Sequence, residues 1–503
     1  MKHYIFLLIF LVGTSTAQAQ TINYFNKTFK PDTMNILSPA ILALENGGYI
    51  VAHTYNTLNN YEGFAIRRIG STGETEWFKH LDYGQEEHIM IGGGVLSATP
   101  DGLFMLVGSK GEVPLVSGGN RDILMIKFDI EGNVIWSKTN GDPDKIENAY
   151  HITPTQDGGY IMCGIQRGFT TSNRFYVLKT DAFGNKEWDS TYSSGAKGLA
   201  YSIAEVLGGY LVSGYRVQAN NQMYLIKIDN QGLLQWEITY GDNTQHNTGC
   251  VVEKLDSTHY LVVGGVREDN ILKMLIGVGD INQNGILLWS KVLNISNWVD
   301  SRLVILGNGF LLSTISKSIY NYDMPVIMRF TSTGDTLWTR TIPGTVLNNN
   351  TYLKDIAPAA DGGYIFSGFN YSTQSSWVVK TDSLGYTCSY LGCDSIATIS
   401  SVPPQTPPLF EGGQGGENSV RIYPNPAQDE VYVWIETPTT MQLATRLNVY
   451  DYTGRLLLTQ PLPAQNTYQP ILLNTQTLPN GLYFCELLTK DGSIVTGKLI
   501  ISR

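Results

Sequence analysis

The stretch Asp157-Gly158-Gly159-Tyr160-Ile161-Met162-Cys163-Gly164, followed by Lys179-Thr180-Asp181-Ala182-Phe183-Gly184-Asn185-Lys186-Glu187-Trp188, decides the fold of this chain. Short runs of β-forming residues alternate here with Gly and Asp turns, which predicts four strands within about 50 residues. The pattern recurs seven times, and 48 to 59 residues separate its hairpin glycines, which are Gly73, Gly132, Gly184, Gly232, Gly285, Gly334 and Gly385. Four-stranded units at this period predict a β-propeller, so we expect an all-β, seven-bladed ring.

Aligning the units assigns structural roles to most of the conspicuous residues. An Asp three residues before the hairpin Gly, as in Asp181, can accept backbone hydrogen bonds within a tight turn. A Trp after the hairpin can seal the contact between neighbouring sheets. A Gly on the second strand, as in Gly164, permits close packing between inner strands. The three sets are Asp129, Asp181, Asp229 and Asp382; Trp77, Trp136, Trp188, Trp236, Trp289 and Trp338; and Gly108, Gly164, Gly214, Gly264 and Gly368.

The seventh unit ends after Gly385 without a recognisable fourth strand. Near the N-terminus, Phe25-Asn26-Lys27-Thr28 matches Trp136-Ser137-Lys138-Thr139 of the second unit. We therefore expect residues 22–29 to supply the missing outer strand and to close the ring of residues 20–390, which leaves no open sheet edge.

The two ends of the chain differ from the repeats. Residues 1–19 have a basic start, an apolar run and Ala17-Gln18-Ala19, which predicts a signal peptide cleaved after Ala19. No later stretch has the roughly 18 apolar residues that a transmembrane helix needs. Residues 391–419 are rich in Pro, Gly and Ser and are expected to be a linker. Residues 420–503 contain alternating apolar runs, which predicts a small Ig-like β-sandwich.

Charge and cysteine content exclude some functions. The formal net charge is −10, and no cluster of Lys and Arg could follow a phosphate backbone, so nucleic acid is not an expected partner. Five cysteines cannot all pair within one chain. Cys163 is expected to be a small packed residue, and Cys250 and Cys485 are expected to be buried thiols. Cys388 and Cys393 can either close a small loop in an oxidising compartment or stay reduced.

The repeat motifs resemble secreted bacterial β-propeller repeats in which Asp-Gly-Gly-Tyr strands alternate with Lys-x-Asp-x-x-Gly-Asn-x-x-Trp hairpins. The C-terminal motifs closely resemble the type A sorting domain of the type IX secretion system. The residues that carry the second resemblance are Tyr423, Pro424, Asn425, Pro426, Gly454, Gly481, Tyr483, Gly497 and Lys498. It implies passage through an outer-membrane translocon, removal of the domain by a sortase-like peptidase, and either attachment to surface lipopolysaccharide or release. The expected location is therefore secreted or on the outer-membrane surface.

Ligands of propellers usually enter at the face that carries the loops between blades and the loops between the second and third strands of each blade. Polar or aromatic residues in these loops suit a glycan or a peptide. The candidates for this face are Tyr55, Asn60, Tyr61, Glu87, His88, Asp144, Glu147, His246, Asp300, Tyr320, Tyr322 and Tyr371. The alternative is that these loops are simply solvated. The first hypothesis is accordingly a binding propeller without a cofactor.

Two other kinds of site were weighed. Asp280, Asn282 and Asn284 resemble the opening of a calcium loop, but Lys291 stands where such a loop needs Glu, so an ordinary Asx turn is the alternative. The second functional hypothesis is an enzyme, either a hydrolase of glycan or peptide or a quinoprotein-like oxidoreductase. No catalytic motif supports it. Carboxylates or His clustered at the axis would favour it, and a flat, uncharged axial face would count against it.

Overall fold

A computed structural model describes most of the chain. The described residues are 24–29, 34–57, 62–83, 87–89, 94–111, 120–169, 171–192, 196–241, 244–268, 271–293, 302–307, 309–317, 323–342, 351–370, 375–387, 420–423, 430–435, 444–451, 456–462, 471–479, 481–489 and 494–501. The expected signal peptide and the Cys388–Cys393 pair lie outside these ranges. Every regular element within them is a strand, and none of them contains a helix able to cross a membrane.

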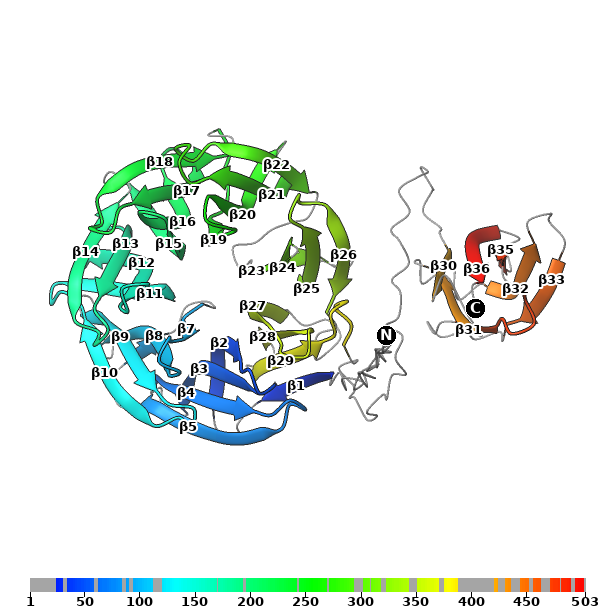
Figure 1. Cartoon of the computed structure of the whole chain (residues 1–503), viewed down its shortest axis with the longest axis horizontal. Coiled ribbons are helices and arrows are strands. Elements are labelled where there is room, and N and C mark those ends of the chain that lie inside the picture. The colour runs from blue at the N-terminus through cyan, green and yellow to red at the C-terminus, as the bar shows by residue number, and fades with distance from the viewer. Residues whose placement is uncertain are drawn as a thin grey trace, which may run out of the picture. The chain divides into compact units, whose positions relative to one another are not determined.

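Seven antiparallel blades lie around a common axis and form a β-propeller (Figure 1). A short parallel pairing of Ile146 with Arg121 joins the second and third blades into one nine-stranded sheet. Each blade is a meander whose first strand lies nearest the axis. The strands of the first four blades are β2 (Met34–Ala43), β3 (Tyr49–Thr57), β4 (Glu62–Ile69) and β5 (Thr75–Tyr83); β6 (Glu87–Ile89), β7 (Leu96–Ala98), β8 (Phe104–Gly111), β9 (Arg121–Phe128) and β10 (Val134–Asn140); β11 (Lys145–Pro154), β12 (Tyr160–Gly168), β13 (Arg174–Thr180) and β14 (Lys186–Tyr192); and β15 (Lys197–Val206), β16 (Gly209–Val217), β17 (Asn221–Ile228) and β18 (Leu234–Tyr240).

The fifth and sixth blades are β19 (Cys250–Lys254), β20 (His259–Glu268), β21 (Ile271–Asp280) and β22 (Leu287–Leu293); and β23 (Arg302–Leu306), β24 (Gly309–Lys317), β25 (Asp323–Thr331) and β26 (Thr336–Thr341). The seventh combines β27 (Thr351–Pro358), β28 (Tyr364–Asn370) and β29 (Ser375–Thr381) with β1 (Phe25–Phe29) from the N-terminus. β1 runs antiparallel to β29, with Phe25 opposite Lys380 and Phe29 opposite Ser376. The fourth strand of the last blade therefore comes from the start of the ring.

The Trp residues pack on the hairpin glycines of the following blade. A Cβ added at Gly132 would lie 2.8 Å from the Trp77 ring, and one at Gly184 would lie 2.9 Å from the Trp136 ring. The same contact joins Trp188 to Gly232, Trp236 to Gly285, Trp289 to Gly334 and Trp338 to Gly385. At the ring closure, Phe25 takes the Trp position and covers Gly73, where an added Cβ would lie 2.8 Å from its ring. One contact type thus repeats around the whole ring.

The turn prediction and the predictions for Cys163, Cys250 and Cys485 are confirmed. Asp181 Oδ1 accepts hydrogen bonds from the backbone N–H groups of Phe183 and Asn185, and Asp129, Asp229 and Asp382 accept equivalent bonds. Cys163, Cys250 and Cys485 are buried free thiols. Cys163 lies between β11 and β13 in the middle of a blade, as expected for a packed residue.

The C-terminal unit contains two sheets that pack into a small β-sandwich. One sheet is formed by β30 (Val420–Tyr423), β31 (Glu430–Ile435) and β34 (Ile471–Asn474), and the other by β32 (Ala444–Asp451), β33 (Leu456–Pro461), β35 (Gly481–Thr489) and β36 (Ile494–Ile501). Its own core includes Val431, Val433, Leu447, Val449 and Leu487. This core is separate from that of the ring, so the unit has the packing of an independent domain.

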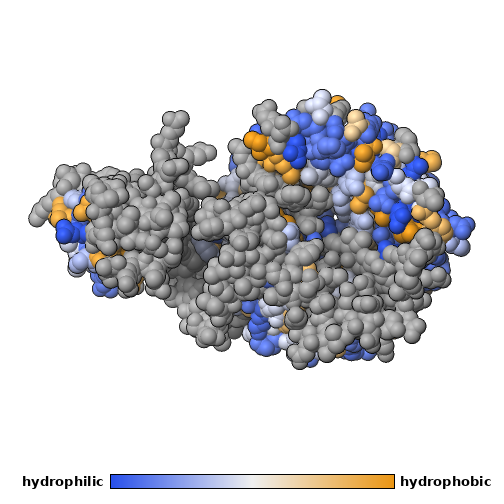
Figure 2. Space-filling view, turned by 180° about the vertical axis from the view of Figure 1, so that it is seen from behind, coloured by the Kyte–Doolittle hydropathy of each residue, from blue (hydrophilic) through white to orange (hydrophobic). Residues whose placement is uncertain are grey.

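The surface of the ring is largely hydrophilic. In Figure 2, apolar residues on the ring, at the right, occur in small groups among polar ones. The most exposed large apolar side chains in the described residues include Leu207, Phe183, Leu233 and Ile286, which lie in or beside tight turns. Scattered apolar residues of this kind are normal on a soluble surface and do not mark a site.

Candidate functional site in the axial channel

The innermost strands of four blades shift register at the same position; on β2 the shift lies between Leu37 and the apolar Ala40, and on the other three strands a polar residue follows it. The pairing register shifts between Ala149 and His151 on β11, between Ala200 and Ser202 on β15, and between Leu353 and Asp355 on β27. A β-bulge bends its strand and re-aims the side chain beside it. On these three strands the polar residue after the shift lines the axial pocket.

A glycine on the neighbouring strand makes room for the bulges on β11, β15 and β27, whereas His53 stands at the matching position opposite the bulge on β2. Gly164, Gly214 and Gly368 lie opposite the shifts, and a Cβ at any of them would collide with the backbone carbonyl of Asn148, Leu199 or Tyr352. These glycines do permit the close packing that the alignment predicted. These glycines also affect the candidate site, because the bulges that they accommodate direct polar side chains toward the axis.

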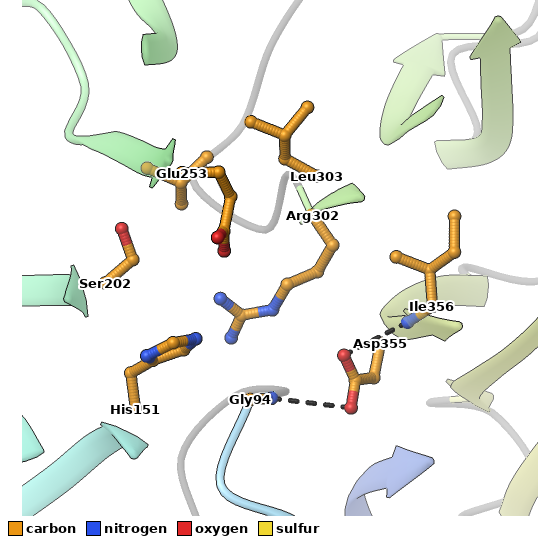
Figure 3. A pocket seen from close by; sticks show the side chains of 9 residues that line it. Gly94, His151, Ser202, Glu253, Arg302, Leu303, Asp355 and Ile356 are labelled. Atoms are coloured by element: carbon orange, nitrogen blue, oxygen red, sulfur yellow. Dashed lines mark hydrogen bonds between the residues drawn. The ribbon is translucent and has the colours of Figure 1, made fainter. Parts of the chain in front are cut away.

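The pocket has a volume of about 150 Å³ and is lined by residues of six blades (Figure 3). One water occupies about 30 Å³ in the liquid, so the space suits a small ligand or the end group of a longer one. Its lining residues are Gly94, His151, Ser202, Val251, Glu253, Arg302, Leu303, Asp355 and Ile356. A pocket built by so many blades exists only when the ring is closed.

Arg302 lies in the middle of this cluster. Its side chain extends from β23 between Glu253 of the fifth blade and Asp355 of the seventh, with the guanidinium pointing toward His151 (Figure 3). The Nε of Arg302 donates a hydrogen bond of 3.0 Å to the carbonyl oxygen of Lys354, which orients the guanidinium plane. Burial raises the pKa of both carboxyl groups and lowers that of His151; the positive charge of Arg302 opposes the rise at the carboxyl groups and adds to the fall at His151.

The Asp355 carboxylate is saturated by backbone donors from three blades. Its Oδ2 accepts hydrogen bonds from the N–H of Ile41 at 3.0 Å and of Gly94 at 3.4 Å, and its Oδ1 accepts one from the N–H of Ile356 at 3.0 Å. Burial raises the pKa of Asp355 while Arg302 and these donors oppose the rise. Asp355 therefore ties the seventh blade to the first and second, directly across the closure of the ring.

Glu253 and His151 present unused hydrogen-bonding capacity to the pocket. Among the described residues, no hydrogen-bond partner is found for the carboxylate of Glu253 or for Nδ1 of His151. Burial raises the pKa of Glu253 to about 7, although Arg302 opposes the shift. Burial and Arg302 together lower the pKa of His151 to about 3, so its imidazole is neutral at neutral pH. Unpartnered polar groups at this depth are unusual in a folded protein and are a mark of functional sites.

This cluster was not predicted as a site. The sequence analysis named carboxylates or His at the axis as a general sign of an enzyme, and such a cluster is present, but it identified none of these residues. A signal existed in the inner strands, where His151, Ser202, Arg302 and Asp355 are polar while Ala40 and Val251 are apolar at the matching position. Polar residues in otherwise apolar strands point to a special environment.

Three of the predicted loop-face residues are described in full. Asp144 is exposed in the turn before β11, and His246 is exposed before β19, where its Nδ1 accepts a hydrogen bond of 3.3 Å from the N–H of Asn221. Glu147 was expected in a loop but lies on β11, fully buried, and its Oε1 accepts a hydrogen bond of 3.0 Å from Nε2 of Gln166. Burial raises its pKa to about 7.

The other loop-face candidates are described in part or not at all. Tyr55 lies on β3, and Glu87 and His88 lie on β6, but their side chains are outside the described part of the structure. The remaining six are wholly outside it: Asn60, Tyr61, Asp300, Tyr320, Tyr322 and Tyr371. Their assignment to a ligand-binding face stays a prediction.

The candidate calcium loop has the hydrogen bonds of an Asx turn. Asp280 Oδ1 accepts a hydrogen bond of 2.8 Å from the N–H of Asn282, and Oδ2 accepts one of 3.3 Å from Gln283 Nε2. Asn282 and Asn284 are exposed. No group of three or more His, Cys, Asp or Glu residues suited to a metal ion is found among the described residues.

The residues of the sorting motif lie on the strands and turns of the sandwich. Tyr423 is on β30, Gly481 and Tyr483 are on β35, and Gly497 and Lys498 are on β36. Tyr483 is buried, and its hydroxyl donates a hydrogen bond of 2.7 Å to the carbonyl oxygen of Pro479. The other four residues, Pro424, Asn425, Pro426 and Gly454, are outside the described ranges.

Residues 421–502 match the family model described as secretion system C-terminal sorting domain. This match indicates export by the type IX system, to the cell surface or as a secreted protein. It covers the sandwich and not the ring.

No curated protein matches the chain. Similar solved structures include a protein of unknown function from Bacteroides caccae (16% identity, 55% of this chain and 90% of that chain, TM-score 0.36). They also include the Hadza microbial sialidase Hz136 (12% identity, 61% and 65%, TM-score 0.36) and a subtype N10 neuraminidase-like protein of A/little yellow-shouldered bat (10% identity, 72% and 97%, TM-score 0.38). Similarity at this level carries no information about activity.

Proposed function

We propose that this protein is an exported propeller that binds a glycan or a peptide, with the end of the ligand held in the axial pocket. The observation that carries the proposal is the pocket itself, in which unpartnered groups of His151 and Glu253 surround a space of about 150 Å³. Ligand sites are concave and have a few convergent polar groups, and this pocket has both properties. Its size fits one terminal group, so the rest of the ligand would extend toward the loops.

In this proposal the C-terminal sandwich directs the export of the protein. After transport through the type IX translocon, a sortase-like peptidase removes the sandwich, and the ring is either attached to surface lipopolysaccharide or released. A binding propeller at the cell surface would then meet extracellular polymers.

An array of glycans and peptides probed with the full secreted protein tests the binding proposal. We expect one chemical class to bind and an Arg302→Gln variant to bind it at least tenfold more weakly, which corresponds to about 1.4 kcal/mol. Leu303→Met, a change of similar volume in the same pocket, is the matched control and should retain binding. If a ligand binds the wild-type protein and the Arg302→Gln variant with equal affinity, its binding site lies outside the pocket.

A hydrolase is the second candidate, and one observation favours it. A carboxyl group with a pKa of about 7 and a neutral imidazole in the same pocket suit general acid–base catalysis near neutral pH. Incubating each array ligand with the protein and analysing the products by mass spectrometry separates the two candidates. Cleavage that Glu253→Gln abolishes would establish the hydrolase, and intact ligand would support binding alone.

A further inference from the structure

Three buried oxygen atoms lie without a hydrogen-bond partner where the second and third blades meet. They are Oδ1 of Asn120, Oδ1 of Asp122 and Oε2 of Glu147, and no donor in the described part of the structure reaches any of them. Buried polar atoms in folded proteins are normally paired, and all three of these atoms are acceptors. What they lack is therefore a donor or a cation.

The strand register places the three side chains next to one another. Arg121 of β9 pairs in parallel with Ile146 of β11. The next residue on each strand, Asp122 and Glu147, therefore lies level with its counterpart on one side of the strand pair. Asn120 precedes Asp122 by two residues and lies on the same side of the chain. The electrostatics agree, since burial raises the pKa of Glu147 to about 7 and the charge of Asp122 adds to the rise.

Neighbouring groups hold these side chains in position. Glu147 is fully buried, and its Oε1 accepts a hydrogen bond of 3.0 Å from Nε2 of Gln166, which lies opposite on β12. Asp122 Oδ1 lies against the backbone of Gly141, where an added Cβ would be 2.0 Å from it. Burial raises the pKa of Asp122, and a hydrogen bond from the Asn120 amide opposes the rise. Because only the nitrogen of that amide donates, its oxygen still lacks a partner.

The two carboxyl groups also lack a paired cation. Among the described residues, no Lys or Arg forms an ion pair with either of them, although Lys110 lies opposite Asp122 on β8. Lys145 Nζ instead pairs with Asp142 Oδ2 at 2.9 Å. Buried charges in proteins are normally paired or coordinate a metal ion, so the second possibility accounts for this arrangement.

We propose that Asn120, Asp122 and Glu147 bind a calcium ion between the second and third blades. Ca²⁺ takes carboxylate and amide oxygens in irregular arrangements, and backbone carbonyls and water would complete its shell of about 6–8 ligands. Mg²⁺ needs a nearly ideal octahedron and fits such a site less well. With only two carboxylates, the site resembles the weak sites of extracellular modules, which have a Kd of about 10⁻⁴–10⁻³ M.

A bound ion would connect two blades at the face that carries the loops between blades. The turn between β10 and β11 contacts Asp122 through Gly141, and the same turn contains the exposed Asp144. Calcium that binds the folded ring and not the unfolded chain would stabilise the ring. The proposal does not depend on the axial pocket, so it stands or falls separately from the proposed function.

Isothermal titration calorimetry of calcium chloride into the chelator-treated full protein tests the site. We expect Ca²⁺ to bind with a Kd of about 1 mM or less, and Mg²⁺ to bind at least tenfold more weakly. Glu147→Gln replaces the carboxyl group by an amide of the same size and should weaken Ca²⁺ binding at least tenfold. Asp280→Asn is the matched control, because it removes a carboxyl group from the other candidate calcium loop, and it should retain the affinity.

Thermal unfolding shows whether Glu147→Gln acts on the ion or merely on the fold. At pH 8 in EDTA, this variant should unfold at the wild-type temperature or above it, because it removes a buried charge that has no paired cation. In about 10 mM calcium chloride, the wild-type midpoint should rise by about 2 °C or more, and the midpoint of the variant should not. A variant that is less stable than wild type by the same amount in both solutions would contradict the proposal.

Three titration results would also overturn it. No binding of Ca²⁺ up to about 20 mM, well above the Kd of weak extracellular sites, would mean that a shared proton neutralises the two carboxyl groups instead. Binding that persists in Glu147→Gln would place calcium elsewhere, and its loss in Asp280→Asn would place it in the turn between β21 and β22. Equal affinities for Mg²⁺ and Ca²⁺ would refute the assignment to calcium.

Discussion

Single glycines opposite the inner-strand bulges determine where the polar side chains of the pocket point. Gly214 pairs with Ala200 immediately before the register shift that directs Ser202 inward. A Cβ at Gly214 would collide with the carbonyl oxygen of Leu199, which belongs to the backbone and cannot rotate away. A glycine is therefore required at position 214 because the neighbouring backbone lies so close to it, and not because of its own backbone conformation.

Gly214→Ala should destabilise the ring because the strand pair must separate or the bulge must be lost. Overpacking a well-filled site costs about 1–3 kcal/mol, and we expect a value at the upper end. Urea unfolding followed by tryptophan fluorescence would show the midpoint move to lower urea. Gly307→Ala is the matched control, since an added Cβ there meets no atom within 4 Å. An equal shift for both variants would contradict the packing argument.

At the scale of single residues, the sequence predicted the tight turns but not the residues of the axial pocket. Asp181 and its counterparts could be assigned because an Asx turn involves residues four apart or fewer. The pocket residues could not be assembled, because His151 and Asp355 are brought together only when the ring closes. Glu147 was misplaced because burial between neighbouring blades carries no local signal.

The repeated contact between blades is the main structural element of the ring. A Trp on six of the outer strands, and Phe25 on β1, covers the hairpin glycine of the next blade. A cation two residues after this aromatic often reaches the residue that follows the glycine. Lys79 Nζ donates to Asn133 Oδ1 at 2.9 Å, and Lys291 Nζ pairs with Asp335 Oδ1 at 2.6 Å. Lys27 of β1 pairs with Glu74 in the same way. The closing strand thus uses the same contacts as the other blades.

Phe25→Ala should weaken the closure specifically. Phe25 is buried against Gly73 and Tyr49, and removing a buried Phe side chain costs about 3–5 kcal/mol. Thermal unfolding should show a lower midpoint, and hydrogen exchange should show loss of protection in β1 and β29. Phe183→Ala removes an exposed aromatic at a hairpin turn and should change stability by about 0.5 kcal/mol or less. A normal midpoint for Phe25→Ala would mean that the closing strand does not hold the ring together.

The sequence predicted the closing strand well. Residues 25–28 match the strands that follow each hairpin because they occupy the same packing position in their blade. The sequence did not reveal that the Trp of one blade serves the glycine of the next. That relation joins residues about 50 positions apart in chain order, and only the closed ring shows it.

At the scale of the whole molecule, the ring and the C-terminal sandwich have separate cores and separate tasks. The sorting motifs were recognisable from sequence because several of them occur in a fixed order, and the match over residues 421–502 supports them. The ligand could not be predicted from the sequence. In a repeat protein the function depends on the residues that differ between units, and many of these loop residues align with no residue in the other units.

Deleting residues 420–503 should block export while leaving the ring folded. In a host with a type IX system, the truncated protein should accumulate in the periplasm, measured by fractionation and immunoblotting. Replacing the exposed turn residue Leu207 by Ser in the full chain is a control that should leave export unchanged. Export of the truncated protein at the normal level would contradict the role of the sandwich.

The central claim is that the end of the ligand binds in the axial pocket. A crystal structure of the full protein with the best ligand from the array tests it most directly. The account predicts the end of the ligand inside the axial pocket, in contact with Glu253 and His151. Ligand bound only at the outer loops, with the axial pocket filled by water, would contradict it.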